Sequence, residues 1–134
     1  MAGWLLDTNH LSAALKPVSQ VRGRIEQALR SGDRVGTSVA VLCEWEAGIQ
    51  ALERREAHRR ALHHLLKRVR VWPLEIQIAQ FYGEIFQDMR RRGRVLSQVD
   101  LMLAALAKAM DLTLLTSDLD FAAVPGLRFE NWLG

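Results

Sequence analysis

Short, continuously apolar segments alternate along this 134-residue chain with longer segments whose apolar residues recur every three or four positions. The first short segment, residues 3–6, is apolar on both faces, which is typical of a strand buried between two layers of helices. Strands that alternate with helices favour a parallel sheet, because each connection between parallel strands crosses over the sheet. We therefore expect an α/β fold of three layers, α/β/α, with a central, mainly parallel twisted sheet of four to five strands.

The boundaries of these elements follow from changes of period, from glycines and from the prolines at positions 17, 73 and 125. The clearest helix, residues 75–92, ends in three arginines followed by Gly93, and both features favour a helix C-terminus. Because repeats, low-complexity stretches and linkers are absent, residues 1–134 are expected to form a single domain. The expected strands are 3–6, 35–37, 71–72, 112–115 and 128–129, and the expected helices are 9–15, 19–31, 38–51, 54–69, 75–92 and 98–110.

Composition narrows the chemistry that the chain can support. Cys43 is the only cysteine, which excludes an intrachain disulfide and a cysteine-rich zinc site. Among the four histidines no two are three or four residues apart, which disfavours a zinc site built on a helix. No apolar stretch approaches the roughly 18 to 20 residues of a membrane span, and the N-terminus does not resemble a signal peptide. We therefore expect a cytoplasmic protein with no membrane partner.

Four acidic residues fall where an α/β sheet places its functional groups. Asp7 directly follows the first strand and Asp118 follows the strand that ends near Leu115, so both belong to the same edge of a parallel sheet. Glu44 and Asp100 lie in helices that can point side chains towards that edge. Clustered carboxylates repel unless a cation neutralises them, and Mg²⁺ or Mn²⁺ is usually held through one or two carboxylates with waters and phosphates. The pattern predicts a divalent-metal site that hydrolyses phosphodiester bonds.

Each of these acids also has a purely structural interpretation. Asp7 can cap the helix that follows it, and Asp100 completes the capping-box pattern S-x-x-D. Asp118 lies in a Ser-Asp-Leu-Asp sequence that favours a turn. Glu44 is two residues from Glu46, and one of the two can be a solvated helix residue. No single acid is therefore diagnostic, and only their combination indicates a site.

Taken together and in this order, four motifs that span nearly the whole chain resemble those of the PIN domain. The similarity is strongest to the VapC-like toxin ribonucleases of bacterial and archaeal toxin–antitoxin pairs. In the second motif the family's acid stands four residues before a glycine, which identifies Glu44 rather than Glu46. The motifs, each with the residues it identifies, are LLDTN (Asp7), SVAVLCEWEAGIQ (Glu44 and Gly48), SQVDLMLAALA (Asp100), and LLTSDLDF with the later VPGLRFENW (Thr116 and Asp118).

The resemblance implies a PIN-like fold and a Mg²⁺- or Mn²⁺-dependent endoribonuclease. It also implies inhibition by a cognate antitoxin and assembly as a homodimer. Two alternatives stay open, a non-catalytic PIN-like scaffold that binds RNA or a partner, and an RNA-processing nuclease outside a toxin–antitoxin pair. The implied catalytic residues are Asp7, Glu44, Asp100 and Asp118, with Asp7 and Asp100 as metal ligands and with Asn9 and Thr116 positioning water, phosphate or the acids.

Arginine dominates the basic residues of the chain. Lysines and arginines number 18 against 15 acids, a net charge of +3, and only three of the 18 are lysines. Arginine suits the recognition of phosphate, so Arg90, Arg91 and Arg92 are candidates for contacts to an RNA backbone. A solvated helix face is the alternative for the same residues.

Overall fold

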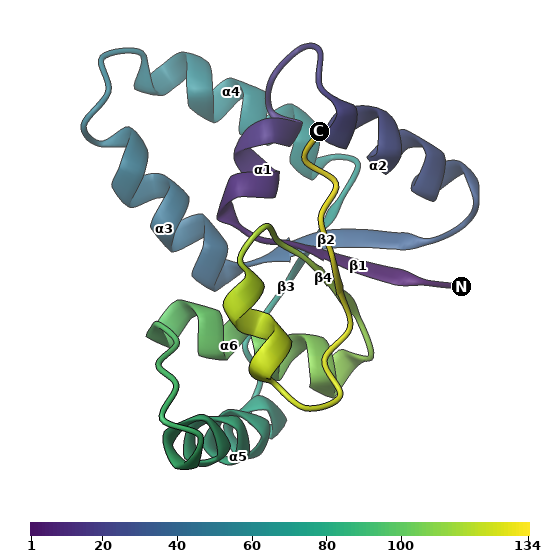
Figure 1. Ribbon diagram of the computed structural model, residues 1–134. Coiled ribbons are helices and arrows are strands. Elements are labelled where there is room, and N and C mark those ends of the chain that lie inside the picture. The colour runs from purple at the N-terminus through teal and green to yellow at the C-terminus, as the bar shows by residue number, and fades with distance from the viewer.

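The computed structural model describes all residues from Met1 to Gly134 (Figure 1). Its centre is a five-stranded sheet in the order β3-β2-β1-β4-β5, and every pair of neighbouring strands is parallel. The strands are β1 (Gly3–Leu6), β2 (Arg34–Ser38), β3 (Arg70–Trp72), β4 (Thr113–Leu115) and β5 (Phe129–Glu130).

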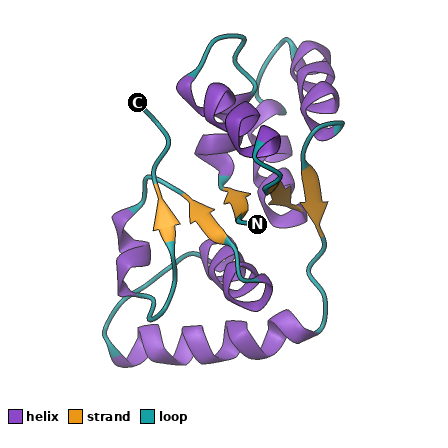
Figure 2. Cartoon of the chain, turned by 90° about the vertical axis from the view of Figure 1, so that its right-hand side faces the viewer, coloured by secondary structure: helices purple, strands orange, loops and turns teal.

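Helices cover both faces of this sheet. In Figure 1, α1, α2 and α4 lie above the sheet and α5 and α6 lie below it, with α3 beside the carboxyl end of β2. Figure 2 shows α5 as the long helix that crosses the bottom of the molecule. The helices are α1 (Thr8–Ala14), α2 (Gln20–Arg30), α3 (Val39–Ile49), α4 (Arg55–Leu66), α5 (Gln77–Arg91) and α6 (Gln98–Met110), and a 3₁₀ helix, η1, covers Leu119–Ala123.

The central strands and α6 form the middle of the core. Leu5 and Leu6 of β1 and Leu114 and Leu115 of β4 are all 0% exposed, as expected for strands covered on both faces. In α6 the run from 103 to 107 is buried without interruption. This explains why the sequence of α6 is apolar on two sides, and it fixes the start of that helix relative to the ends of β1 and β4.

The expected three-layer α/β/α fold and its parallel sheet are confirmed. The last strand lies one residue later than predicted, at Phe129–Glu130, and α4 ends at Leu66 rather than at residue 69. The prediction missed η1, because one short 3₁₀ turn shows no repeat of apolar residues and only the Asp118 cap marks its start. None of the helices combines the length and apolar character that crossing a bilayer requires.

Trp4, Trp72 and Trp132 pack in or against the core. Trp72 and Trp132 are buried, while Trp4 is partly buried and packs against Trp132 with 4.9 Å between ring centroids. The indole N–H of Trp4 donates to Asp33 at 3.0 Å, which satisfies its one polar atom.

Candidate functional site

Six sequence-predicted site residues line a single pocket at the carboxyl edge of the sheet. The pocket has a volume of about 370 Å³ and is lined by eight residues, of which one is hydrophobic. We call it the acidic pocket, and its eight residues are Asp7, Thr8, Asn9, Glu44, Asp100, Leu103, Thr116 and Asp118. Segments separated by more than a hundred residues therefore meet where the sheet topology predicts.

Asp7 is both the N-cap of α1 and a wall of the acidic pocket. Its Oδ1 accepts a hydrogen bond from the backbone N–H of His10 at 2.8 Å, and Nδ1 of His10 lies 3.0 Å from the same oxygen. The capping interpretation and the site interpretation are thus compatible, because both contacts use Oδ1 and leave Oδ2 for a ligand.

Glu44 lies in the second turn of α3 and is exposed at the edge of the acidic pocket. Its Oε1 accepts a hydrogen bond of 2.6 Å from the hydroxyl of Thr8. Glu46, by contrast, does not line the pocket. It receives two hydrogen bonds from Arg59, at 3.0 and 3.1 Å, and these lower the pKa of the Glu46 carboxyl below its usual value. Glu46 therefore serves the packing of α3 against α4.

Asp100 stands in the first turn of α6, where its backbone N–H donates to Oγ of the N-cap Ser97 at 3.1 Å. Burial raises the pKa of the Asp100 carboxyl above its ordinary value, and a hydrogen bond with Ser97 opposes that rise. The negative charges of Asp118, Glu44 and Asp7 raise the pKa of Asp100 further. The pocket thus carries a concentrated negative potential that a cation would relieve.

Thr116 and Asp118 enter the acidic pocket from the segment after β4. Thr116 is 2% exposed, and its hydroxyl accepts from the backbone N–H of Asp118 at 3.1 Å. Asp118 Oδ1 accepts from the N–H of Asp120 at 2.9 Å and caps η1. Asp120 lies outside the pocket, so its neighbour Asp118 is the acid of this turn that faces the site.

The donors of the acidic pocket suit a hard divalent cation. Seven of its eight lining residues offer oxygen atoms, and the pocket contains no sulfur or imidazole donor. No three acidic, histidine or cysteine side chains are grouped so that they could hold a metal ion among them. Mg²⁺ is usually held by one or two carboxylates and several waters, so the residues fit that kind of site and do not fit a fully protein-lined cage.

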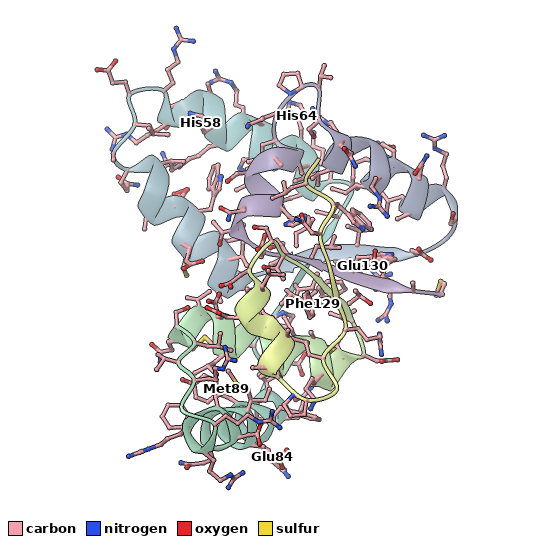
Figure 3. All side chains as sticks on the ribbon, in the orientation of Figure 1. His58, His64, Glu84, Met89, Phe129 and Glu130 are labelled. Carbon is pink, nitrogen blue, oxygen red and sulfur yellow. The ribbon has the colours of Figure 1, made fainter.

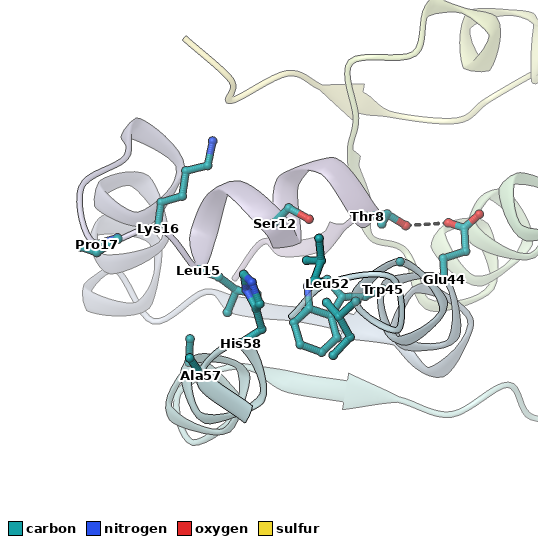
Figure 4. Close-up of a pocket in the computed structure, with 13 residues that line it drawn as sticks. Thr8, Ser12, Leu15, Lys16, Pro17, Glu44, Trp45, Leu52, Ala57 and His58 are labelled. Carbon is teal, nitrogen blue, oxygen red and sulfur yellow. Dashed lines mark hydrogen bonds between the residues drawn. The ribbon is translucent and has the colours of Figure 1, made fainter. Parts of the chain in front are cut away.

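A second cavity, which we call the helix groove, borders the acidic pocket (Figure 4). It has a volume of about 470 Å³ and runs between α1, α3 and α4. Thr8 and Glu44 line both cavities, and the hydrogen bond between them forms the border. Lys16 and Pro17 lie at the end of the groove away from Thr8 and Glu44, as Figure 4 shows.

The three arginines predicted to contact RNA lie at the C-terminus of α5 and do not line the acidic pocket. All three are exposed, and Nε of Arg92 pairs with Asp88 at 3.0 Å. Met89, labelled in Figure 3, marks the turn of α5 that precedes them. The loop after α5 leads directly to the start of α6, and this connection brings the arginines towards the end of α6 that holds Asp100.

Sequence reasoning missed two residues that hold the acids in place, Thr8 and His10. Thr8 bonds to Glu44 across 36 positions, and no local pattern signals such a contact. His10 stands three positions after the N-cap Asp7, and this spacing was a usable signal because an N-cap side chain reaches that position.

A family model described as the PIN domain matches residues 4–127 of the chain. The chain is 25% identical over 130 residues to Ribonuclease VapC2 of Rickettsia felis, and the match covers 96% of this chain and 97% of that protein. It is 29% identical over 135 residues to the tRNA(fMet)-specific endonuclease VapC of Shigella flexneri, with 98% and 99% covered. The likeness therefore extends over nearly the whole length of both relatives.

The crystal structure of DNA-bound VapBC from Salmonella typhimurium contains a chain with the same fold. Its TM-score against this chain is 0.87 at 26% identity, over 98% of this chain and 99% of that one. The expected PIN-like arrangement of strands and helices is thereby confirmed.

Proposed function

This chain belongs to the PIN domain family, and we propose that it is the toxin of a toxin–antitoxin pair, an endoribonuclease that hydrolyses RNA phosphodiester bonds with a divalent metal. Its similarity to ribonucleases named VapC runs from end to end of those proteins, which supports the activity and the toxin role. The observation that carries the proposal is the acidic pocket, where four carboxylates from distant segments meet beside Asn9 and Thr116.

We assign the cation to Asp7 and Asp100. Both line the acidic pocket, each stands at a helix start that fixes its backbone, and Asp7 keeps one carboxylate oxygen free of hydrogen bonds from the chain. Mg²⁺ or Mn²⁺, when bound, supplies Lewis-acid polarisation of the phosphate and lowers the pKa of water.

The remaining pocket residues orient the reactants. Glu44 and Asp118 are exposed carboxylates that can accept hydrogen bonds from water and hold it beside the phosphate. The Glu44 carboxylate keeps its position through the Thr8 hydroxyl, and the buried Thr116 keeps the Asp118 backbone in place. Asn9 is exposed and offers an amide donor to a phosphate oxygen.

RNA approaches this pocket as a polyanion, which the four carboxylates repel. We assign the attraction to Arg90, Arg91 and Arg92, whose exposed guanidinium groups can bind backbone phosphates. An antitoxin partner would hold the nuclease inactive, and a homodimer is the expected assembly. The solved Salmonella relative is a VapBC complex bound to DNA, which supports a partner protein here.

The proposal is tested by RNA cleavage with the purified chain. We expect cleavage with Mg²⁺ or Mn²⁺, no cleavage with EDTA, and loss of cleavage in Asp7→Asn and Asp100→Asn. Asparagine keeps the size of aspartate, and at position 7 it can also keep the helix cap, while the N-cap of α6 is Ser97 and is not changed. These variants therefore remove charge and leave both helix caps in place.

The chain offers matched controls for the other two acids. Asp120→Asn is the control for Asp118→Asn, and Glu46→Gln is the control for Glu44→Gln, because Asp120 and Glu46 lie outside the acidic pocket. Activity should fall with the pocket variants and persist with the controls. Full activity of Asp7→Asn or Asp100→Asn would contradict the assignment.

A further inference from the structure

His10 is a fully buried histidine that does not line the acidic pocket but contacts Asp7 directly. Its ring is 0% exposed, and Nδ1 lies 3.0 Å from Oδ1 of Asp7. On the other side of the ring, Nε2 accepts a hydrogen bond of 3.0 Å from the backbone N–H of Trp132. The imidazole therefore joins the acidic pocket to the C-terminal segment that follows β5.

These two contacts determine which ring nitrogen carries the proton. A backbone N–H can only donate, so Nε2 has to present its lone pair to Trp132. In the neutral imidazole the proton is then on Nδ1, and Nδ1–H donates to Oδ1 of Asp7. The opposite tautomer would set two N–H groups against each other at Trp132 and would leave no donor towards Asp7.

The same geometry fixes the carboxylate of Asp7. Oδ1 accepts from the backbone N–H of His10 at 2.8 Å and from Nδ1–H of the same residue at 3.0 Å. Two donors on one oxygen hold the carboxylate against rotation and leave Oδ2 without a partner from the chain. Hydrogen bonds of this kind to a ligating carboxylate orient it, and their removal typically lowers metal affinity about 10- to 100-fold.

Trp132, whose backbone N–H donates to Nε2 of His10, is itself held in place by its packing. The residue is 2% exposed and packs against Trp4 of β1. The guanidinium of Arg24, from α2, lies 4.6 Å from the centre of its ring. The position of the Trp132 backbone is thus set by the sheet and by α2.

We propose that His10 is a positioning residue for the metal site. It holds Oδ1 of Asp7 through Nδ1–H, leaves Oδ2 to the divalent cation, and makes the geometry of the site depend on the C-terminal segment around Trp132. The inference rests on the proposed function, because it takes Asp7 as a metal ligand. It adds that His10, a residue outside the pocket, sets the orientation of the Asp7 carboxylate. The alternative is a histidine that only joins α1 to the C-terminal segment and affects stability alone.

Two variants separate the contacts of His10. The amide of His10→Asn reaches the position of Nδ1 and keeps a donor for Asp7, while the N–H of Trp132 is left without an acceptor. The longer amide of His10→Gln reaches the position of Nε2 and keeps an acceptor for Trp132, while Asp7 is left without this donor. His10→Leu removes both contacts and serves as the reference.

The measurements are the dissociation constant for Mn²⁺, by isothermal titration calorimetry without RNA, and the thermal unfolding midpoint in EDTA. We expect His10→Gln and His10→Leu to bind Mn²⁺ about 10- to 100-fold more weakly than the wild type. By the same reasoning, His10→Asn should stay within about threefold of the wild type although it unfolds at a lower temperature than His10→Gln. His10→Asn would then bind Mn²⁺ more tightly than His10→Gln and yet unfold at a lower temperature. A purely structural role of His10 does not produce this opposite ranking.

Metal affinities that follow the unfolding midpoints, or a wild-type affinity in His10→Gln, would overturn the inference and leave the proposed function standing. A wild-type chain that binds no Mn²⁺ would overturn both. Long-range ¹⁵N–¹H correlation spectra give an independent check, because they report which ring nitrogen is protonated. Protonation at Nδ1 is expected, and an Nε2–H tautomer would refute the geometry on which the inference depends.

Discussion

The hydroxyl of Thr8 donates a 2.6 Å hydrogen bond to Oε1 of Glu44, and this contact closes the border between the acidic pocket and the helix groove. It links the first turn of α1 to the second turn of α3. One of the four clustered carboxylates therefore has its position set by a neutral hydroxyl rather than by a cation.

Replacement of Thr8 by valine should slow RNA cleavage about fivefold, equivalent to about 1 kcal/mol, because the variant removes the donor that orients Glu44. Thr8→Ser keeps the hydroxyl and should retain most of the activity. Single-turnover rates with saturating enzyme give the comparison. Equal rates for the valine variant and the wild type would show that the contact does not orient Glu44 during the reaction.

Asp100→Asn should raise the thermal unfolding midpoint of the metal-free protein while it abolishes cleavage. The carboxylate of Asp100 is partly desolvated and lies near the charges of Asp118, Glu44 and Asp7, and all of these disfavour its ionised form. A rise of about 2 to 4 °C in EDTA is expected from the relief of this repulsion.

With Mg²⁺ present, the wild type should unfold at a higher temperature than Asp100→Asn, which is the reverse of the order expected in EDTA. A ligand that binds only the folded state stabilises it, so the wild-type midpoint should rise with Mg²⁺ concentration and the Asp100→Asn midpoint should hardly move. Differential scanning fluorimetry across a Mg²⁺ series measures both effects. A variant that is stabilised by Mg²⁺ as strongly as the wild type would exclude Asp100 as a ligand.

The ion pair between Glu46 and Arg59 predicts a pH-dependent contribution to stability. The pKa of the folded-state Glu46 carboxyl is lowered from 4.5, chiefly by the hydrogen bond from Arg59. The contribution is therefore fully present above pH 4.5 and disappears as the pH falls through the lowered pKa. Glu46→Gln should unfold more easily than the wild type at pH 7, and the difference should vanish in acid.

Urea unfolding of both proteins, from neutral pH down to well below the ordinary pKa of a glutamate, tests this prediction. Glu53→Gln is the control, at an exposed glutamate of the α3–α4 connection, and it should match the wild type across the range. A Glu46→Gln deficit that persists unchanged at the acidic end would assign the effect to packing rather than to the ion pair.

Much of this site was predictable because it depends on order along the chain. Asp7 and Asp118 follow strands, and a parallel sheet brings the ends of its strands to one edge, so their approach needed no knowledge of side-chain packing. The choice between Glu44 and Glu46 came from similarity to a family, and the Arg59 contact now supplies its physical reason.

What the sequence did not reveal depends on long-range contacts between side chains. The bond from Trp132 to His10 spans 122 positions, and no periodicity encodes it. The sequence of η1 also shows no helical pattern, because five residues are too few to establish a helical repeat. The residues that hold the acids are thus less visible in the sequence than the acids themselves.

Reversal of charge at Arg90, Arg91 and Arg92 tests their assignment to the RNA backbone. If these exposed side chains neutralise phosphates, the triple glutamate variant should bind RNA more weakly, and its binding should depend less on salt. The slope of log K against log salt should become shallower by about 0.7 for each phosphate of single-stranded RNA that the variant no longer neutralises. Fluorescence anisotropy with a labelled RNA, in EDTA so that no cleavage occurs, measures the slope.

A matched reversal of equal charge is available in α4, at its N-cap Arg54 and at Arg55 and Arg60 in its first two turns. In Figure 1, α4 lies above the sheet and α5 lies below it, and the α5 arginines precede the loop that leads to α6, which holds Asp100. The α4 reversal should therefore weaken binding less than the α5 reversal at the same net charge. Equal losses of affinity in the two variants would mean that RNA binding depends only on the total charge of the protein. The α5 arginines would then not contact the RNA backbone specifically.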